Sequence, residues 1–317
     1  MAERVLVTGG AGFIGSHIVA AHLAAGDAVT ILDDLSTGRR ENVPAGVPLV
    51  VADVRSAEAR RCVAEGGFTI VNHHAAQIDV RKSVADPVND ASINVLGLIN
   101  ILEGARAGGV RRVIFSSSGG TVYGEGLAVP QREDAAKLPA SPYGTAKLAA
   151  EYYLAMFSLL YGLEGVALRY SNVYGPRQDP HGEAGVVAIF AQRLLAGEAL
   201  TVFGTGEQTR DLVYAGDVAE ANVLASRATL PPLTSIDSRA FNVGTGVETS
   251  VNGLAAAMGA AAGRSPEVRR APARLGEIER SALDPGKAAR VLGWRPRHTL
   301  ADGVRATFEW FRSTAGC

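Results

Sequence analysis

A glycine-rich turn near the N-terminus constrains the fold of this chain more than any other feature. Gly9, Gly12 and Gly15 directly follow the apolar run Arg4–Thr8 and open a helical stretch. Glycines at this spacing let backbone amides at a helix N-terminus approach a pyrophosphate without obstruction by Cβ atoms. Asp33 closes the next apolar run, where a carboxylate accepts hydrogen bonds from an adenosine ribose and repels a 2′-phosphate. The turn therefore predicts a dinucleotide site that favours NAD over NADP.

Short apolar runs alternate with longer helical stretches through the first half of the chain. We expect strands at Arg4–Thr8, Ala28–Asp33, Pro48–Ala52, Thr69–His73, Arg112–Ser117 and Gly165–Arg169. We expect helices between them, at Ile14–Ala25, Ala57–Glu65, Val88–Ala107 and Pro142–Leu160. This alternation predicts an α/β fold with a Rossmann-like, doubly wound parallel sheet.

The texture changes after Tyr174, where Gly175-Pro176 and a polar loop precede an expected helix at Val186–Ala196. A helix at Ala215–Arg227 and a strand at Ala240–Gly244 are placed to return to the main sheet, and residues 252–310 read as small helices and loops. We therefore expect interleaved domains. Residues 1–174 plus roughly 211–246 form the NAD-binding domain, and roughly 175–210 plus 247–317 form a smaller C-terminal substrate-binding lobe.

Composition excludes several classes of function. The net charge is −1 without a basic block, so neither nucleic acid nor an anionic membrane surface is an expected partner. With only Cys62 and Cys317, neither a disulfide framework nor a cysteine metal site is expected. Adjacent residues of a strand face opposite ways, so His73 and His74 are interpreted as structural, and no metal is predicted. No signal-peptide pattern or membrane-length apolar segment is present, which favours a cytoplasmic location.

Tyr143 and Lys147 form the smallest unit that can deprotonate an alcohol beside a nicotinamide. Residues four apart are neighbours on a helix face, and Ser141-Pro142 is a good helix start. A free tyrosine loses its proton near pH 10, so a tyrosine base needs its pKa lowered by roughly three units. A nearby lysine ammonium supplies much of that shift. The pair predicts an oxidoreduction step at a carbinol carbon.

The run FSSSGGTVYGE ends the fifth expected strand with hydroxyl groups. Ser118 is our candidate for the residue that hydrogen-bonds the reacting oxygen beside Tyr143. Ser117 is the alternative, because a one-residue error in register exchanges the two. Loops after the third and fourth strands add cofactor candidates, which are Asp53, Val54, Ala75, Ala76 and Gln77.

Six motifs together carry a family resemblance: VTGGAGFIGS, LDDLSTG, HHAAQ, SSSGGTVYG, SPYGTAK and LRYSNVYGPR. They resemble the extended short-chain dehydrogenase/reductase family, and within it the UDP-glucose 4-epimerases, over nearly the whole chain. The resemblance implies that Tyr143 is the base, that Lys147 holds the nicotinamide ribose, and that Ser118 assists proton transfer. It also implies further cofactor contacts from Phe13, Ile14, Asp34, Thr37, Gly38, Asn94, Ser116, Ser117, Tyr170 and Val173.

The second lobe supplies candidate substrate residues. Asn172, Arg210 and Arg274 are donors suited to a diphosphate, since guanidinium groups bind phosphate oxygens in pairs. The resemblance implies that Arg210 and Arg274 bind the diphosphate of a UDP-sugar and Glu277 the uridine ribose. It further implies that Thr201 and Phe203 contact uracil and that Val186 lines the nucleotide channel.

The resemblance implies NAD-dependent 4-epimerisation of a UDP-hexose. Relatives that dehydrate or decarboxylate sugar nucleotides carry an acid after the strand-end hydroxyl, where this chain has Gly119-Gly120-Thr121. One alternative is a UDP-N-acetylglucosamine 4-epimerase, which a small residue at Ser281 favours, or another NAD-dependent nucleotide-sugar oxidoreductase. A non-catalytic NAD-binding regulator is an alternative from another class.

Two apolar helical stretches suggest a homodimer. The segments 88–107 and 144–160 are suited to pairing across a two-fold axis as a four-helix bundle, as in the dimers of the family. The alternative is that these faces pack only on their own sheet.

Overall fold

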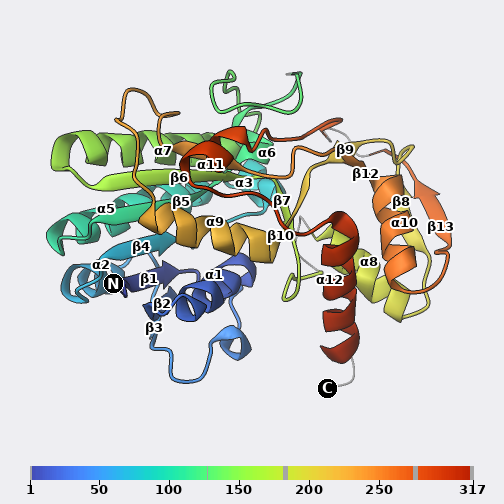
Figure 1. Ribbon diagram of the computed structural model, residues 1–317, viewed down its shortest axis with the longest axis horizontal. Coiled ribbons are helices and arrows are strands. Elements are labelled where there is room, and N and C mark those ends of the chain that lie inside the picture. The colour runs from blue at the N-terminus through green and yellow to red at the C-terminus, as the bar shows by residue number, and fades with distance from the viewer. Residues whose placement is uncertain (1, 127, 181–184, 274–277, 315–317) are drawn as a thin grey trace.

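The computed structural model describes residues 2–126, 128–180, 185–273 and 278–314. A parallel sheet of seven strands in these residues has the order β11-β6-β5-β4-β1-β2-β3 (Figure 1). Its strands are β1 (Arg4–Thr8), β2 (Ala28–Asp33), β3 (Leu49–Val51), β4 (Ile70–His73), β5 (Arg112–Ser118), β6 (Glu164–Tyr170) and β11 (Ala240–Val243). The order reverses beside β1, which is the topology of a doubly wound sheet.

Helices cover both faces of the sheet because side chains along each strand alternate between them. On β1, Val5 and Val7 join the core beneath α1 (Phe13–Ala24), α9 (Ala215–Arg227) and α11 (Gly286–Val291). Leu6 joins the opposite core, beneath α2 (Ala57–Glu65), α5 (Gly97–Ala107) and α7 (Pro142–Tyr161). Short elements follow β2, β4 and β5: η1 (Arg40–Asn42), α3 (Val80–Ala85), α4 (Pro87–Ala91), η2 (Ser92–Leu96) and α6 (Gly119–Val122).

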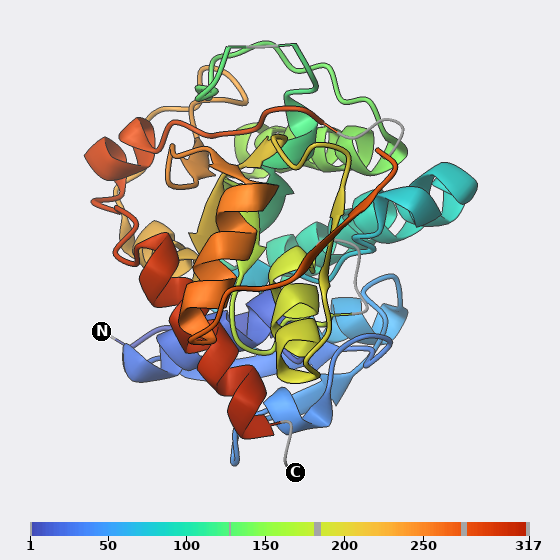
Figure 2. The same ribbon diagram turned by 90° about the vertical axis from the view of Figure 1, so that its right-hand side faces the viewer.

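A second lobe has its own apolar core (Figures 1 and 2). Its elements are α8 (Val186–Leu195), β8 (Leu200–Phe203), α10 (Val251–Ala261), β13 (Val268–Ala271) and α12 (Leu300–Thr314). The parallel pair β8–β13 closes its outer side. Two small strand pairs link it to the sheet: β7 (Asn172–Tyr174) with β10 (Leu212–Tyr214), and β9 (Thr209–Arg210) with β12 (Thr249–Ser250).

The predicted parallel sheet is confirmed, with strand and helix ends displaced by a residue or two, but one expected helix differs in detail and one expectation was wrong. The segment 88–107 is helical throughout, as expected, but Ser92–Leu96 form a π-helical turn, η2, between α4 and α5. Periodicity cannot reveal a π-turn, which inserts one residue into an otherwise continuous apolar pattern. The segment 252–310 was expected to hold only small helices and loops, yet it contains β13 and the first part of the 15-residue α12.

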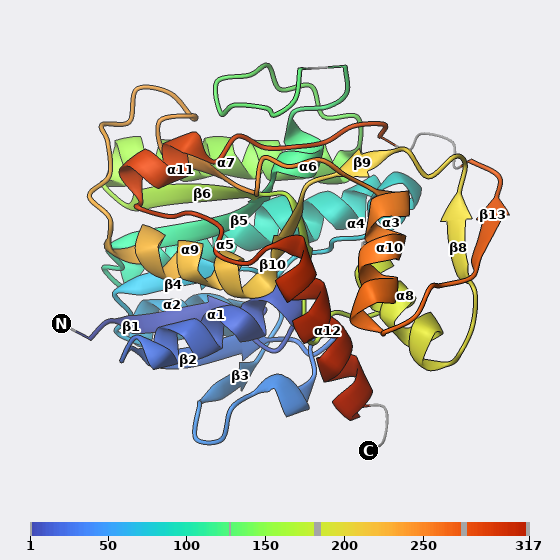
Figure 3. The ribbon, with the colours of Figure 1, turned by 45° about the vertical axis from the view of Figure 1, so that its right-hand side comes forward.

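The fold positions a site at one end of the sheet. The carboxyl ends of parallel strands share one edge, and ligands of such sheets bind there. In Figure 3 the N-terminus lies at the far end of the sheet, and the second lobe stands beside the opposite end. The loops after β1, β2, β4 and β5 therefore face the second lobe.

Candidate active site

The glycine turn after β1 leaves no space for side chains. Gly9 has φ +68°, and a Cβ there would lie 2.7 Å from the backbone N of Ala75. A Cβ on Gly15 would collide with the carbonyl of Gly9. Gly12 is the N-cap of α1, and no side chain caps this end of the helix. The backbone amides of the first turn are therefore not paired with a capping side chain. These features fit the pyrophosphate of NAD, which a helix N-terminus stabilises.

Asp33 is buried at the end of β2, beside the glycine turn. Its Oδ2 accepts a hydrogen bond of 2.9 Å from Ala11 N, and its Oδ1 accepts one of 2.9 Å from Leu35 N. Burial raises the pKa of Asp33. A Cβ on Gly38 would lie 2.5 Å from Oδ1, so the following loop folds closely over the carboxylate. The position suits an acceptor for the adenosine ribose of NAD.

The loop after β4 is held by the side chain of Asn94, which η2 carries. Asn94 Oδ1 accepts from Gln77 N, and Asn94 Nδ2 donates to Gln77 O, both at 3.0 Å. This amide therefore pairs with both backbone groups of one residue. The contact makes Asn94 a support for the loop that contains Gln77.

The other cofactor candidates lie around the same edge. Asp53 forms an ion pair with Arg55 at 2.5 Å, and Val54 is buried against Gly97. The others are Phe13 and Ile14 in the first turn of α1, the exposed Asp34 and Thr37 after β2, Ala75 and Ala76 after β4, Ser116 on β5, Tyr170 at the end of β6, and Val173 on β7.

Tyr143 and Lys147 lie on the first turns of α7. Ser141 Oγ caps this helix by accepting from Gly144 N at 3.1 Å, and Pro142 occupies its first turn. Lys147 Nζ lies 5.7 Å from the centroid of the Tyr143 ring and donates to Ser116 O at 2.8 Å. Helix cap and strand end thus fix the ammonium beside the tyrosine.

Lys147 is buried, and burial disfavours its charged form. Burial lowers the pKa of Lys147 to about 8, while the carboxylates of Asp90 and Glu151 act in the opposite direction. A cation this close to Tyr143 favours the phenolate form of the tyrosine. The structure therefore places a buried cation beside the ring of Tyr143.

The three serines that end β5 have different surroundings. Ser117 is buried, and its hydroxyl donates to Glu151 Oε1 at 2.5 Å. Ser118 is half-buried, and a Cβ on Gly120 would meet Ser118 Oγ alone, at 4.0 Å. Open space therefore adjoins the hydroxyl of Ser118, whereas the hydroxyl of Ser117 is hydrogen-bonded inside the protein.

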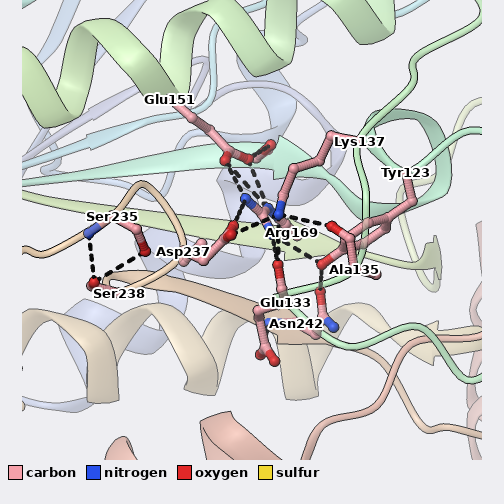
Figure 4. A network of polar contacts seen from close by, with 12 residues as sticks. Tyr123, Glu133, Ala135, Lys137, Glu151, Arg169, Ser235, Asp237, Ser238 and Asn242 are labelled. Carbon is pink, nitrogen blue, oxygen red and sulfur yellow. Dashed lines mark hydrogen bonds and ion pairs between the residues drawn. The ribbon is translucent and has the colours of Figure 1, made fainter.

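A buried ionic network is centred on Arg169 and includes Glu151, the partner of Ser117 (Figure 4). Arg169 donates to Glu151 through Nε at 3.0 Å and Nη2 at 2.6 Å, and to Asp237 through Nη2 at 2.8 Å. Lys137 Nζ lies 2.7 Å from the other oxygen of Asp237. The sequence analysis missed this network. One signal was available, because Glu151 continues the four-residue spacing of Tyr143 and Lys147.

His73 is buried at the end of β4, and the next residue, His74, is half-buried. His73 Nδ1 lies 2.9 Å from Thr8 Oγ1, and His74 Nε2 lies 2.9 Å from the hydroxyl of Tyr170. Burial lowers the pKa of His73 to about 3 and that of His74 well below its usual value. Within the described ranges, no group of three His, Cys, Asp or Glu residues is arranged to hold a metal ion.

The neutral state of His73 predicts destabilisation by acid. Below pH 6.5 the unfolded chain protonates this histidine, while the folded chain does not until about pH 3. Its contribution to the free energy of unfolding should fall by about 1.4 kcal/mol per pH unit in that window. Urea unfolding at pH 7.0 and pH 5.5, at one NAD concentration, should show a smaller loss for His73→Asn than for the unsubstituted protein. Equal losses would contradict the assignment.

The substrate candidates lie in and beside the second lobe. Arg210 Nη1 donates to Ile278 O at 2.7 Å, and Thr201 Oγ1 accepts from Arg193 Nη1 at 2.8 Å. Asn172 and Phe203 are half-buried, and Val186 begins α8. Arg274 and Glu277 lie outside the described residues, and Ser281 is buried.

Asp211 is a further residue that the sequence analysis missed. Its carboxylate accepts from Thr245 N at 2.8 Å and from Leu283 N at 3.1 Å. It thereby joins the loop after β11 to the segment that contains Leu283. The residue stands next to Arg210 in the chain, but its neighbours in sequence gave no sign of these contacts.

Comparison with known proteins agrees with this geometry. The model of the NAD dependent epimerase/dehydratase family matches residues 5–244. A UDP-glucose 4-epimerase of Mycolicibacterium smegmatis is 48% identical, covering 98% of this chain and 99% of that protein. No described helix is long and apolar enough to cross a membrane.

Solved structures agree over the same length. The UDP-glucose 4-epimerase of Thermotoga maritima with UDP-glucose superposes with a TM-score of 0.93 at 43% identity, covering 98% of this chain and 99% of that one. The Thermus thermophilus UDP-glucose 4-epimerase in complex with NAD gives a TM-score of 0.90 at 48% identity, with the same coverage. With its glycine turn, Asp33 and the Tyr143–Lys147 pair, this chain belongs to the NAD dependent epimerase/dehydratase family.

Proposed function

We propose that this protein is an NAD-dependent UDP-hexose 4-epimerase that interconverts UDP-galactose and UDP-glucose. The observation that carries the proposal is the position of Tyr143, which lies one helical turn from a buried lysine and beside the end of β5. A tyrosine base and an NAD cradle at one sheet edge suit oxidation of an alcohol. The relatives named above support the choice of sugar nucleotide.

In the proposed reaction, Tyr143 as phenolate takes the proton of the sugar 4-hydroxyl. NAD⁺ held by the glycine turn and Asp33 would supply the oxidising power, as acceptor and donor of the C4 hydride. The sugar C4–O bond becomes a carbonyl, and the keto sugar turns over before the hydride returns to its opposite face. Tyr143 then gives the proton back, so no net oxidation occurs. Lys147 stabilises Tyr143 at the stages where the tyrosine is a phenolate.

The two glycines that follow Ser118, Gly119 and Gly120, support epimerisation over dehydration. Dehydration needs an additional acid next to the reacting sugar. A side chain at Gly119 would collide with Leu283, and Gly120 carries no side chain. The chain therefore offers no acid at these two positions, and the same carbon is oxidised and reduced.

Proton NMR of the protein with UDP-galactose and NAD⁺ tests the function. We expect UDP-glucose to accumulate to an equilibrium mixture without accumulation of NADH. Conversion of UDP-N-acetylglucosamine alone would instead show an epimerase for acetylated sugars. Protein that binds NAD but converts none of the nucleotide sugars would contradict the proposal and support a regulator.

We assign the assisting hydroxyl to Ser118, and two substitutions test the assignment. Ser118→Ala should lower kcat by about 10²-fold, because a group that assists proton transfer is lost. Ser117→Ala should retain most activity but lower the free energy of unfolding by about 1.5–3 kcal/mol, since a hydrogen bond to a charged group is lost. Steady-state kinetics and urea unfolding of both variants separate the roles. The reverse pattern would assign the role to Ser117.

We also propose a homodimer through α4, α5 and α7. Large apolar side chains on these helices and the intervening η2 are exposed: Val88, Leu96, Tyr152, Leu159 and Leu160. In Figure 1 α5 and α7 run side by side, so two copies would form a four-helix bundle. Light scattering should give twice the chain mass, and Leu160→Arg should reduce it to the chain mass. A monomeric unsubstituted protein would contradict this arrangement.

A further inference from the structure

Asp211 is a fully buried carboxylate between β9 and β10, and its hydrogen-bond donors are neutral groups. Its Oδ1 accepts from Thr245 N at 2.8 Å and from Thr245 Oγ1 at 2.6 Å. Its Oδ2 accepts from Gly246 N and from Leu283 N, each at 3.1 Å. A buried charge is tolerated only where such bonds compensate it, and bonds to a charged acceptor are stronger than neutral ones. Asp211 therefore anchors its donors firmly.

One of these donors, Leu283, belongs to the segment 278–284, which reaches the serine end of the site. The Leu283 side chain is buried, and a Cβ on Gly119 would collide with it. Gly119 begins α6 and directly follows Ser118. In Figure 3 the segment runs from beside β9, past α6, toward α11. One end of segment 278–284 is thus packed against the residue next to Ser118.

The backbone around Leu283 is held from two sides. Gln131 N donates to Ala282 O, and Asp284 N donates to Gln131 O, both at 2.8 Å. Successive backbone groups of an extended segment point to opposite sides, so the Leu283 amide faces away from Gln131. Asp211 accepts from that amide on the other side. Without the carboxylate, a buried donor would be left unpaired, which is unfavourable.

The other end of segment 278–284 contacts Arg210, the residue before Asp211 in the chain. Arg210 Nη1 donates to Ile278 O at 2.7 Å. Two consecutive residues of opposite charge therefore hold the two ends of one segment. A displacement of the segment would move the carbonyl that Arg210 contacts, so the direction of the guanidinium depends on where the segment lies.

We propose that Asp211 is a positioning residue that fixes segment 278–284 between α6 and Arg210, and so orients the Arg210 guanidinium toward the substrate diphosphate. The part that concerns the substrate rests on the function proposed above. The anchoring of the segment does not, since it is measurable without any nucleotide. The two parts are therefore tested separately.

Hydrogen exchange, followed by mass spectrometry in NAD-saturated protein without a sugar nucleotide, tests the anchoring. In Asp211→Asn one carboxylate oxygen becomes an NH₂ group, which cannot accept from the amides of Leu283 and Gly246. We expect faster amide exchange in segment 278–284, because local opening becomes easier once its anchor is lost. Unchanged exchange in this segment would overturn the proposal, whatever the activity of the enzyme.

Asp217→Asn is the matched control. Asp217 is 2% exposed, and its Oδ2 accepts from Arg297 N and His298 N at 3.1 Å each. The variant thus removes the same kind of buried anchor from a different part of the chain. Exchange should become faster around residues 297–298 and stay unchanged in segment 278–284. Equal acceleration of segment 278–284 in both variants would indicate general loosening and would overturn the proposal.

Calorimetry with UDP, in NAD-saturated protein, tests the consequence for the substrate. In Asp211→Asn we expect the Kd for UDP and the KM for UDP-galactose to rise about tenfold, with a smaller change in kcat, because binding of the diphosphate is weakened throughout the reaction. NAD affinity should be unchanged, and Asp217→Asn should bind UDP normally. Normal UDP affinity in Asp211→Asn would overturn the proposal. Failure of the unsubstituted protein to bind UDP would instead contradict the proposed function, and the exchange measurement would still decide the anchoring.

Thr245→Val decides the case in which Asp211→Asn does not fold. It keeps the carboxylate but removes the hydroxyl that donates to Oδ1, so the hold of Asp211 on Leu283 N should loosen. We expect the Kd for UDP to rise about threefold, since one hydrogen bond to the anchor is lost. Thr245→Ser keeps the hydroxyl and should restore the affinity. Equal affinities in the two Thr245 variants and the unsubstituted protein would overturn the proposal.

Discussion

Tyr143→Phe is expected to lower kcat for UDP-galactose epimerisation by about 10³-fold or more, because the substitution removes the proposed base and leaves its ring in place. The hydroxyl group is the part of Tyr143 that exchanges a proton with the sugar. The ring lies 5.7 Å from Lys147 Nζ, so its packing against the lysine should persist. Coupled detection of UDP-glucose gives the rate.

Binding measurements provide the control for this variant. NAD affinity, measured by calorimetry, and the free energy of unfolding should both change little, since the glycine turn and Asp33 are untouched. Loss of NAD binding along with activity would mean that Tyr143 supports the cofactor site instead of the chemistry. Activity within tenfold of the unsubstituted enzyme would exclude Tyr143 as the base.

The part of the site that could be predicted from sequence is the part built from local patterns. The glycine turn, Asp33 and the capped start of α7 depend on residues close together in the chain. A parallel sheet then brings its strand ends to one edge without further information. These features place Tyr143 and Lys147 beside the NAD cradle.

The rest depends on contacts between distant segments. Arg169 lies within an apolar strand, and its partners Glu151 and Asp237 come from a helix and a distant loop. Neither apolar periodicity nor residue spacing identifies such a pairing. The π-helical turn η2 was not predicted for a related reason. It contains Asn94, which holds the loop of Gln77 through tertiary hydrogen bonds.

The second lobe was predicted least well. The strand β13 contains Arg269 and Arg270, and most of its side chains are exposed, so it lacks the apolar signal of a core strand. Its structure depends on parallel pairing with β8, which lies more than sixty residues earlier. Strand propensity alone is too weak to reveal such an edge.

Arg169→Met is the substitution with the largest expected effect on stability. The side chain is 0% exposed, and its removal leaves the buried Glu151 carboxylate without its ion-pair partner. Breaking a buried ion pair in this way costs about 3–5 kcal/mol of the free energy of unfolding. Arg169→Lys should restore only part of it, since an ammonium cannot reproduce the paired guanidinium contacts with Glu151. Urea unfolding measures both variants.

Two comparisons separate loss of the ion pair from loss of packing. Arg60→Met is a control, because Arg60 is 50% exposed and pairs with Glu103 at 3.1 Å, so it should cost less than about 1 kcal/mol. The double variant Glu151→Gln with Arg169→Met should be more stable than Arg169→Met alone, since no uncompensated carboxylate then faces the methionine. A double variant as unstable as the sum of its single variants would assign the effect to packing. Recovery would show that the burial of Glu151 is tolerated only because Arg169 neutralises it.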